Sequence, residues 1–560
     1  MISQSLVTIQ GHITDEWGNS LENVIISVKE TNSTTYSNVE GRYKLSIPAN
    51  QDVIVRVHYS LTDTIITINS SKKEYNISLT LKGEKLQEID ITARYNDNYV
   101  RIDPKLNYKI PTPGGGLESL IKLLPGVSST NELSSQYNVR GGNFDENLIY
   151  INDIEIYKSF LVRNAQQEGL SFVNLDLTNS VKFSAGGFEA RYGDKMSSVM
   201  DVEYNQPTSY GGSFMASILG ASGHVEGNVN DKFIFLAGIR FRSNAYLFTS
   251  LDTKGVYKPT FFDTQLQLTW KPVKKLEITL MGVFSNNSYF QRPESREQAI
   301  GTITSSQKLY VLYDGQEVDQ YENYLGGLTF KYKINDNNHL RLILSSYYAQ
   351  EKETFDILYR YNIRATEADL GASGGSYVEE GPILGTGAFR EHARNAMNAI
   401  VSAADLRGEH RIKHSVLSWG IKFQNEIIHD RLREWSFIDS SGHILPNFGT
   451  GTPGDFVPLE DPSRIIQLPE NRFVSAVNDL NTWRVSGFVQ NVWNIDGDSA
   501  TRFKLNTGIR FHYWSYNHDI VFSPRINFIY KPHWKNDWTF FLRTGLYYQP
   551  PFYREFRNAK

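Results

Sequence analysis

The sequence predicts a mainly β protein with three parts: a small N-terminal β-sandwich, an α/β segment, and an incomplete antiparallel transmembrane β-barrel. Two observations support this fold class. Segments with alternating apolar and polar residues recur along the 560 residues, separated by turns rich in Gly, Asn and Pro. From residue 206 onward these segments reach about 9–11 residues and end in aromatic side chains, which suits a tilted strand that crosses a bilayer. Since no run of about 18 apolar residues occurs, no transmembrane helix is expected.

Residues 6–80 are predicted to form the sandwich. In the segment TTYSNVEGRYKLSIP a turn precedes a strand that places Tyr43, Leu45 and Ile47 on one face. Several such short strands within about 75 residues indicate a small sandwich. The stretch GHITDEWGNSLENVIISVKETNSTTYSNVEGRYKLSIP resembles the carboxypeptidase-regulatory-like domain, which is a transthyretin-like sandwich. This resemblance rests on the turn residues Gly18, Asn38, Glu40, Gly41 and Tyr43.

Residues 111–205 combine one helix with short strands. In TPGGGLESLIKLLPGV, the residues Leu117, Leu120 and Ile121 fall on one helical face, and Pro125 ends the helix. The glycines before this helix do not form a phosphate-binding loop, because no Lys followed by Ser or Thr comes after them. Strands joined by glycine turns follow, beginning with the hairpin in YNVRGGNFDENLIYINDIEIY.

Residues 206–560 are predicted to form the barrel. In FKLNTGIRFHY, Phe503 and Ile509 share one face, whereas Lys504 and Arg510 share the other. Long strands with one apolar and one polar face favour a membrane barrel over a soluble sandwich or propeller, which remains the alternative. We expect about 12–16 strands, and a wide barrel needs a small globule, polar on its outside, to close its lumen.

Five motifs occur in the order found in one family of outer-membrane proteins. LQEIDITA, SLIKLLPGV, YNVRGG, LIYINDIEIY and SVKFSAGGFEARYGDKMSSVMDVEY resemble the TonB box and plug of TonB-dependent receptors and transporters. The resemblance implies that residues 81–110 are a linker carrying the box and that residues 111–205 are the plug. An N-terminal regulatory-like sandwich is a known variant of this family. The box would consist of Leu86, Gln87, Glu88, Ile89, Asp90, Ile91, Thr92 and Ala93.

The resemblance also implies roles for plug residues. Arg140 would make polar contacts between plug and barrel wall, where acidic lumen residues could hold it. Tight plug turns would contain the glycines Gly141, Gly142, Gly186, Gly187 and Gly193. The polar residues of the opening hairpin are candidates for a ligand-facing surface, with ordinary turn residues as an equal alternative. These are Asp145, Glu146, Asn152 and Asp153.

The family resemblance implies active import of an extracellular ligand across the outer membrane. TonB, driven by the inner-membrane proton gradient, would pair with the box as an added strand from the periplasm, where the N-terminal domain lies. Expected partners are therefore TonB, outer-membrane lipid and an unidentified ligand. A surface lipoprotein stays open as a partner, although the sugar-importing branch that pairs with one typically has IDG where this chain has NDIEIY after LIYI. The alternatives are a TonB-linked signalling receptor and a β-rich surface binding protein without transport.

The ends of the chain suggest a fragment. The first residues, MISQSLVTIQ, lack the basic start and apolar stretch of a secretory signal. The last residues, FRNAK, follow YYQPPFYREF without an aromatic closing strand, and an open barrel edge facing lipid would leave backbone groups unsatisfied. We therefore expect a chain cut inside the barrel whose true start is missing.

Catalytic, metal and cofactor sites are not expected. His410 and His414 lie four residues apart in EHRIKH but lack a third ligand nearby. No nucleophile or paired-carboxylate motif stands out, so we predict that the chain is not an enzyme and binds no cofactor. The formal net charge of −4 gives no reason to expect nucleic acid as a partner.

Overall fold

The structure is a computed structural model of the whole chain, and it describes five main stretches: residues 6–79, 99–157, 171–246, 255–439 and 473–558. The shorter gaps inside these stretches are 16–17, 22–23, 29–32, 39, 50–51, 60–61, 70–71, 111–115, 130–134, 231, 303–304, 369–376, 413–414, 497–501, 533 and 535–537. The predicted TonB box, residues 86–93, lies outside the described residues.

The N-terminal segment is a two-sheet β structure around one apolar core. One sheet has the order β4-β1-β7 and the other β3-β2-β5-β6. Alternate residues such as Ile26, Leu45 and Val55 point between the sheets and are buried, whereas their neighbours face solvent. The strands are β1 (Leu6–Asp15), β2 (Ile25–Val28), β3 (Thr34–Tyr36), β4 (Arg42–Pro48), β5 (Asp52–Tyr59), β6 (Thr62–Asn69) and β7 (Ile77–Leu79).

The next segment, residues 99–205, is here called the plug. Its main sheet has the order β12-β11-β14-β13-β8, in which β11 and β14 run parallel, and helix α1 packs its Leu117, Leu120 and Ile121 into the core as predicted. The elements are β8 (Val100–Ile102), η1 (Pro104–Tyr108), α1 (Leu117–Ile121), β9 (Val127–Ser128), β10 (Asn138–Val139), η2 (Phe144–Glu146), β11 (Asn147–Ile151), β12 (Ile154–Glu155), η3 (Leu175–Leu177), β13 (Thr178–Ser184) and β14 (Ser198–Tyr204).

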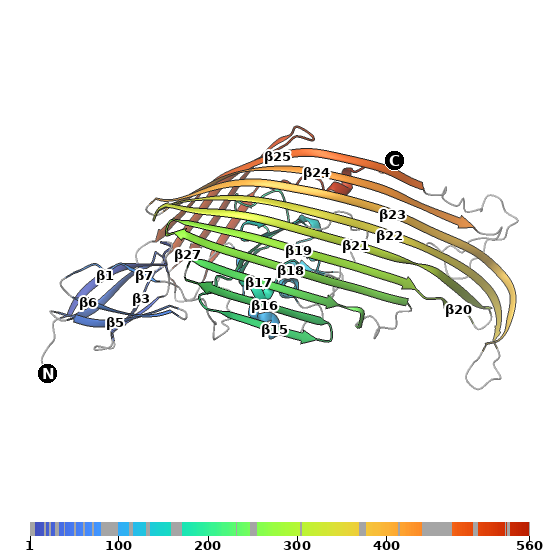
Figure 1. Cartoon of the computed structure of the whole chain (residues 1–560), viewed down its shortest axis with the longest axis horizontal. Helices are drawn as coiled ribbons and strands as arrows, with labels where there is room; N and C mark the ends of the chain where they lie inside the picture. Colours follow the sequence, from blue (N-terminus) through green and yellow to red (C-terminus); the bar gives the residue numbers. More distant parts are fainter. Residues whose placement is uncertain are drawn as a thin grey trace.

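The remaining chain forms one antiparallel sheet, here called the wall, that arches over the plug (Figure 1). Within the described residues it has 14 strands, and its order runs from β15 to β28 without a pairing between those two. The elements are β15 (Gly211–Ser217), β16 (Gly220–Val229), β17 (Phe233–Ser243), β18 (Gly255–Val273), β19 (Leu276–Pro293), β20 (Arg296–Thr302), β21 (Ser305–Asn335), β22 (Asn338–Ala368), β23 (Tyr377–Ile412), β24 (Ser415–Asp439), β25 (Phe473–Asp496), β26 (Arg502–Trp514), β27 (Ile520–Lys531), β28 (Phe540–Gly545) and α3 (Tyr553–Phe556).

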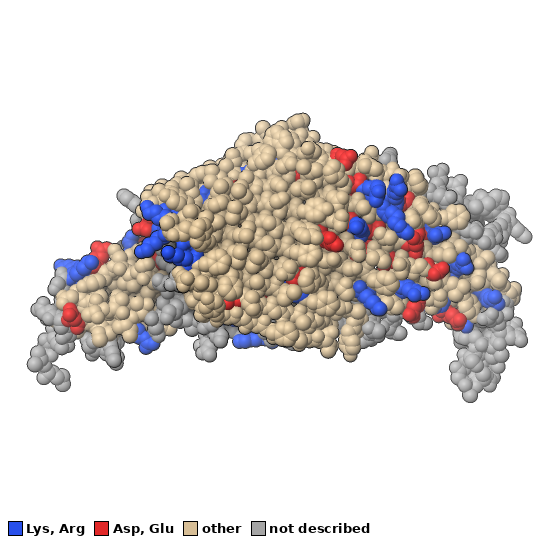
Figure 2. All heavy atoms as spheres, in the orientation of Figure 1, with Lys and Arg blue, Asp and Glu red and all other residues tan. Residues whose placement is uncertain are grey.

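Burial along the wall is the reverse of that in a soluble sheet. On β26 the apolar residue Ile509 is 47% exposed, whereas its neighbours Arg510 and His512 are 6% and 8% exposed. The apolar face therefore points outward, and the polar face points to the plug. Figure 2 shows the result as a broad belt almost free of charged side chains across the middle of the wall. This arrangement confirms the predicted membrane-barrel pattern, because only lipid accepts such a belt.

Several strands are much longer than the expected 9–11 residues. The strands β21 and β22 have 31 residues each, and β23 has 36. The expectation was wrong for these strands because their pairing continues beyond the apolar belt, where neighbouring strands still satisfy each other's backbone groups. Among the described residues, no helix is long and apolar enough to span a membrane.

The sandwich contacts the wall at the end where short turns join the strands. Arg411, near the end of β23, donates a hydrogen bond to the Gly18 carbonyl at 2.8 Å and another to the Asn19 side chain. Gly18 has a φ of +83°, and the Asp15 carboxylate accepts the Asn19 backbone N–H at 2.7 Å, which shapes the loop. This places the sandwich beside the short-turn end of the wall (Figure 1).

A disulfide should lock this contact. A Cβ built at Gly18 lies 3.8 Å from Cβ of Asp336, in the turn between β21 and β22, and disulfides have a Cβ–Cβ separation of about 3.8 Å. Because the chain has no cysteine, we expect Gly18→Cys with Asp336→Cys to form a single cross-link on oxidation. Non-reducing electrophoresis of the full chain measures it. Gly18→Cys with Lys274→Cys, on a neighbouring turn, should stay reduced, and equal cross-linking of both pairs would contradict a fixed contact.

Candidate functional site

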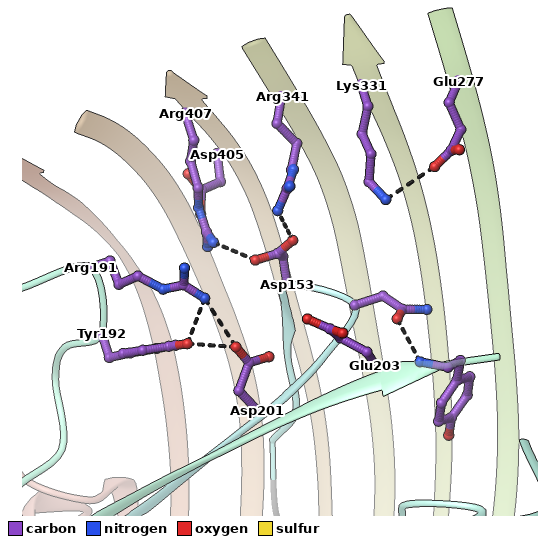
Figure 3. Close-up of polar contacts among 12 residues, drawn as sticks. Asp153, Arg191, Tyr192, Asp201, Glu203, Glu277, Lys331, Arg341, Asp405 and Arg407 are labelled. Atoms are coloured by element: carbon purple, nitrogen blue, oxygen red, sulfur yellow. Dashed lines mark hydrogen bonds and ion pairs between the residues drawn. The ribbon is translucent and has the colours of Figure 1, made fainter. Parts of the chain in front are cut away.

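The hairpin turn between β11 and β12 anchors the plug to the wall. Asn152 and Asp153 both have a positive φ, 49° and 69°, so the turn projects its side chains away from the plug sheet. The Asp153 carboxylate accepts hydrogen bonds from Arg341 on β22 and from Arg407 on β23, the latter at 2.9 Å (Figure 3). Arg407 is also paired with Asp405 at 2.7 Å. One plug carboxylate thus bridges two neighbouring wall strands.

The electrostatics of this anchor favour the charged form of Asp153. Burial alone would raise the pKa of Asp153, but Arg341 and Arg407 outweigh burial and hold the pKa well below its ordinary value. The side chain of Asp153 is 15% exposed and that of Arg407 is 15% exposed, so both charges are largely removed from water. Separating them would leave poorly solvated charges, which is costly.

Neighbouring residues extend the anchor along the wall. Lys422 on β24 pairs with Glu155 at 2.6 Å, and the Tyr157 hydroxyl donates to Gln424 at 2.7 Å. On a strand earlier in the wall sheet, β18, Gln267 accepts a hydrogen bond from the Asn152 side chain. A cavity of about 10 Å³ lies between hairpin and wall, room for about one water. The hairpin therefore packs closely against the wall, with little free space between them.

A second anchor lies in the plug segment before β14. Arg510 on β26 pairs with Asp194 at 2.8 Å, and His512 lies 3.1 Å from the same carboxylate. Burial would raise the pKa of Asp194, but Arg510 and His512 hold it well below its ordinary value. Arg525 on β27 donates to the Tyr192 carbonyl at 2.5 Å. These contacts therefore attach the plug to wall strands from β18 to β27.

Two predicted glycines belong to this second contact. A Cβ at Gly193 would lie 1.8 Å from Nε of Arg510, and a Cβ at Gly187 would lie 2.7 Å from Cδ of Arg543 on β28. Gly187 also has a φ of +66°. Only glycine lets the plug backbone approach the wall arginines this closely. Their predicted role in tight plug turns stays a prediction.

The other predicted residues lie within the plug. Arg140 is exposed and lies beside Gly126 and Gly186, so its contact with the wall stays a prediction. Glu146 accepts a hydrogen bond from Ser197 at 2.6 Å, and the carbonyl of Asp145 accepts one from Lys195 at 2.6 Å. Gly141 has a φ of +83° and Gly142 packs against Ser197. Ligand contact by Asp145 and Glu146 likewise stays a prediction, whereas Asn152 and Asp153 are placed against the wall.

The wall arginines were not singled out by the sequence. Arg341, Arg407, Arg510 and Arg525 all lie on the polar, inward face of their strands. A sequence signal exists, because an Arg in the polar register of a membrane strand faces the lumen, where a buried cation needs a carboxylate or carbonyl partner. Figure 3 shows the same pattern inside the plug, where Arg191 and Tyr192 converge on Asp201.

Family models match both parts of this site. Residues 112–199 match the model described as TonB-dependent Receptor Plug Domain, and residues 277–559 match the one described as TonB dependent receptor-like, beta-barrel. A comparison with curated proteins found no match.

The solved structures that this chain resembles include two receptors and a transporter. The siderophore receptor PirA from Pseudomonas aeruginosa is 12% identical, with 81% of this chain and 100% of that chain covered and a TM-score of 0.28. The unliganded ferric citrate transporter FecA is 12% identical, with 80% and 62% covered and a TM-score of 0.43. BauA, the ferric preacinetobactin receptor from Acinetobacter baumannii, is 11% identical, with 72% and 57% covered and a TM-score of 0.39. This chain thus spans less than two thirds of the length of the last two, and the identities indicate no ligand for it.

Proposed function

Because this chain belongs to the TonB-dependent receptor family, we propose that it binds an extracellular ligand and imports it actively, energised by TonB acting on the box and the plug. The family consists of outer-membrane transporters and receptors rather than enzymes, and its members interact with TonB and with ligands. The short-turn end of the wall faces the periplasm and the long strands extend outward, as in bacterial outer-membrane barrels.

The observation that carries the proposal is the dense plug–wall contact. Asp153 and Asp194, whose side chains are 15% and 23% exposed, join the plug to arginines on β22, β23 and β26. Thermal motion rarely breaks several such pairs together, since separation leaves uncompensated charges in a poorly hydrated lumen. A ligand can pass only if work is done on the plug, and that requirement is the physical reason for coupling to an energy source.

We propose that the force on the plug is transmitted through residues 86–93. Nineteen residues, 80–98, separate the described end of the sandwich at Leu79 from the start of the plug at Tyr99. We propose that TonB pairs with the box in this linker as an added strand and pulls on the plug through it. The proposed division of the chain is a sandwich at 6–80, a linker at 81–110 whose last part, from Tyr99, joins the plug sheet through β8, a plug domain at 111–205 and a barrel from 206.

An uptake comparison tests the proposal. Cells with and without the full-length gene are grown in the same complex medium, and depletion of solutes from the medium is profiled with and without a proton uncoupler. We expect at least one solute to be depleted only by energised cells that carry the gene. A chain that binds a solute on whole cells but depletes none in either condition would instead support the signalling or surface-binding alternatives.

A further inference from the structure

The loop that follows β1, here called the docking loop, fastens the sandwich to the wall through Asp15, Gly18 and Asn19. The Asp15 carboxylate accepts hydrogen bonds from the backbone N–H and from the side-chain amide of Asn19, both at 2.7 Å. The Gly18 carbonyl and the Asn19 amide oxygen both accept from Arg411, near the end of β23. Asp15 thus shapes the docking loop so that two neutral oxygens meet one wall arginine.

This contact can open more easily than the contacts between plug and wall. Its acceptors on the sandwich are uncharged, Asn19 is exposed, and Arg411 keeps Glu409 as a neighbour at 3.6 Å when the docking loop leaves. In contrast, separating Asp153 from the wall arginines leaves a carboxylate that is only 15% exposed without its cations. A pull shared by the two contacts therefore breaks the sandwich contact first.

The proposed TonB box is tied to the sandwich by a short length of chain. Strand β7 ends at Leu79 and pairs with β1 directly before the docking loop, with Asp15 opposite Leu79. Six residues, 80–85, separate Leu79 from Leu86, the first residue of the box. Because an extended chain spans at most about 3.6 Å per residue, Leu86 cannot move more than about 25 Å from Leu79 while β7 stays paired.

Withdrawing the plug needs a longer reach than this. In the proposed function TonB acts from the periplasm, so the box must travel away from the wall before plug residues can follow it. Residues 99–108 of the plug take up about 33 Å when extended, which already exceeds the reach of about 25 Å. As long as Arg411 holds the docking loop, only the first residues of the plug can leave the lumen.

We propose that the docked sandwich restrains the plug, and that TonB releases this restraint by pulling the docking loop away from Arg411. While the restraint holds, the box stays near the wall and the plug stays in the lumen. After release the sandwich follows the box, and the force then reaches the plug anchors at Asp153 and Asp194. This inference rests on the proposed function, because the force enters the chain at residues 86–93.

Locking the docking loop to the wall tests the proposal. Cells that carry the full-length gene with Gly18→Cys and Asp336→Cys are compared, after oxidation and after reduction, for energised depletion of the solutes that cells with the natural chain deplete from complex medium. We expect the oxidised pair to deplete these solutes no faster than cells without the gene, and the reduced pair to deplete them at the natural rate. The natural chain and the pair Gly18→Cys and Lys274→Cys, which should not cross-link, should deplete equally in both states.

A longer tether distinguishes a limit on reach from other effects of the cross-link. About 20 Gly and Ser residues inserted after Gly83 would let the box travel about 70 Å farther from the locked sandwich. The oxidised pair with this insertion should therefore deplete the medium as the natural chain does. The same insertion in the natural chain should change nothing.

Two outcomes would overturn the restraint while leaving import in place. They are equal depletion by the oxidised and reduced pairs although electrophoresis shows the cross-link, and slow depletion by the oxidised pair even with the longer tether. Failure of the natural chain and of every variant to deplete any solute would instead contradict import, and the restraint with it. Normal depletion by the reduced pair shows that the two substitutions leave the barrel folded.

Discussion

Deleting residues 86–93 is expected to reduce energised uptake to that of cells without the gene, while binding of the same solute to whole cells stays unchanged. The deletion removes the strand that TonB would pair with, and backbone hydrogen bonds of an added strand supply most of the affinity in such complexes. The plug and wall are untouched, so a ligand site between them would be preserved. Uptake and surface binding are measured in the same cells for the solute found by depletion profiling.

Point variants sharpen this prediction. Ile89→Pro with Ile91→Pro keeps the linker length but removes two backbone donors and blocks strand pairing, so it should act like the deletion. Ile89→Val with Ile91→Val keeps the strand and should transport normally. If the proline variant transported as well as the valine variant, residues 86–93 would not be where TonB acts. A loss of binding together with uptake would point instead to a failure of the chain to assemble.

The alternation of apolar and polar residues predicted the strands of the wall, because it can be recognised from the local sequence alone. Phe503 and Ile509 were assigned to one face and Arg510 to the other, and the structure exposes the first two and buries the third. Above the belt this signal fails, since both faces become polar. On β23, His392 and Arg394 point outward while Asn395 points inward, and no apolar alternation marks them as a strand. The extra length of β21 to β23 could therefore not be inferred.

The contact between the plug and the wall could not be predicted from the sequence, for a different reason. The sequence showed a polar turn at Asn152 and Asp153 between two apolar segments, but the partners Arg341 and Arg407 lie 188 and 254 residues from Asp153. Pairing them requires the strand register of the whole wall and the position of the plug inside it. The family resemblance pointed to Arg140 as the contact with the wall, but the sequence alone does not show whether a turn arginine or a turn aspartate faces an opposite charge on the wall.

Asp153→Ala is expected to lower the free energy of plug unfolding by about 3 kcal/mol, the lower end for breaking a buried ion pair. The lower end applies because Arg407 keeps Asp405 as a partner and the Arg341 side chain is 37% exposed. Urea-dependent hydrogen exchange of β11 and β12 in the purified chain measures the change. The control is Glu203→Ala, which breaks the exposed Lys182–Glu203 pair of the plug and should cost at most about 1 kcal/mol.

The pH dependence of this difference follows from the depressed pKa of Asp153. A carboxyl group whose folded pKa lies below its unfolded value, near 3.9, contributes its full stabilisation above that value and loses it as the pH falls toward the folded pKa. The difference between the natural chain and Asp153→Ala should therefore be constant from pH 8 to pH 5 and shrink below about pH 4. A difference that already falls between pH 7 and pH 5 would indicate that another group titrates at the anchor.

A third variant distinguishes the loss of the attraction between Asp153 and the two arginines from the cost of leaving those arginines unpaired. Replacing Arg341 and Arg407 by Met in the Asp153→Ala background removes the cations that the first change leaves unpaired, and apolar side chains of similar volume often restore stability in such sites. Asp405 would then lose its partner, so the recovery should be partial. A recovery of plug stability would mean that unpaired wall arginines make the plug costly to detach. This cost is the free-energy barrier that an energy source must overcome. If Asp153→Ala alone cost no more than Glu203→Ala, the hairpin would not be an anchor, and the plug would be held through Asp194 and the wall strands around it.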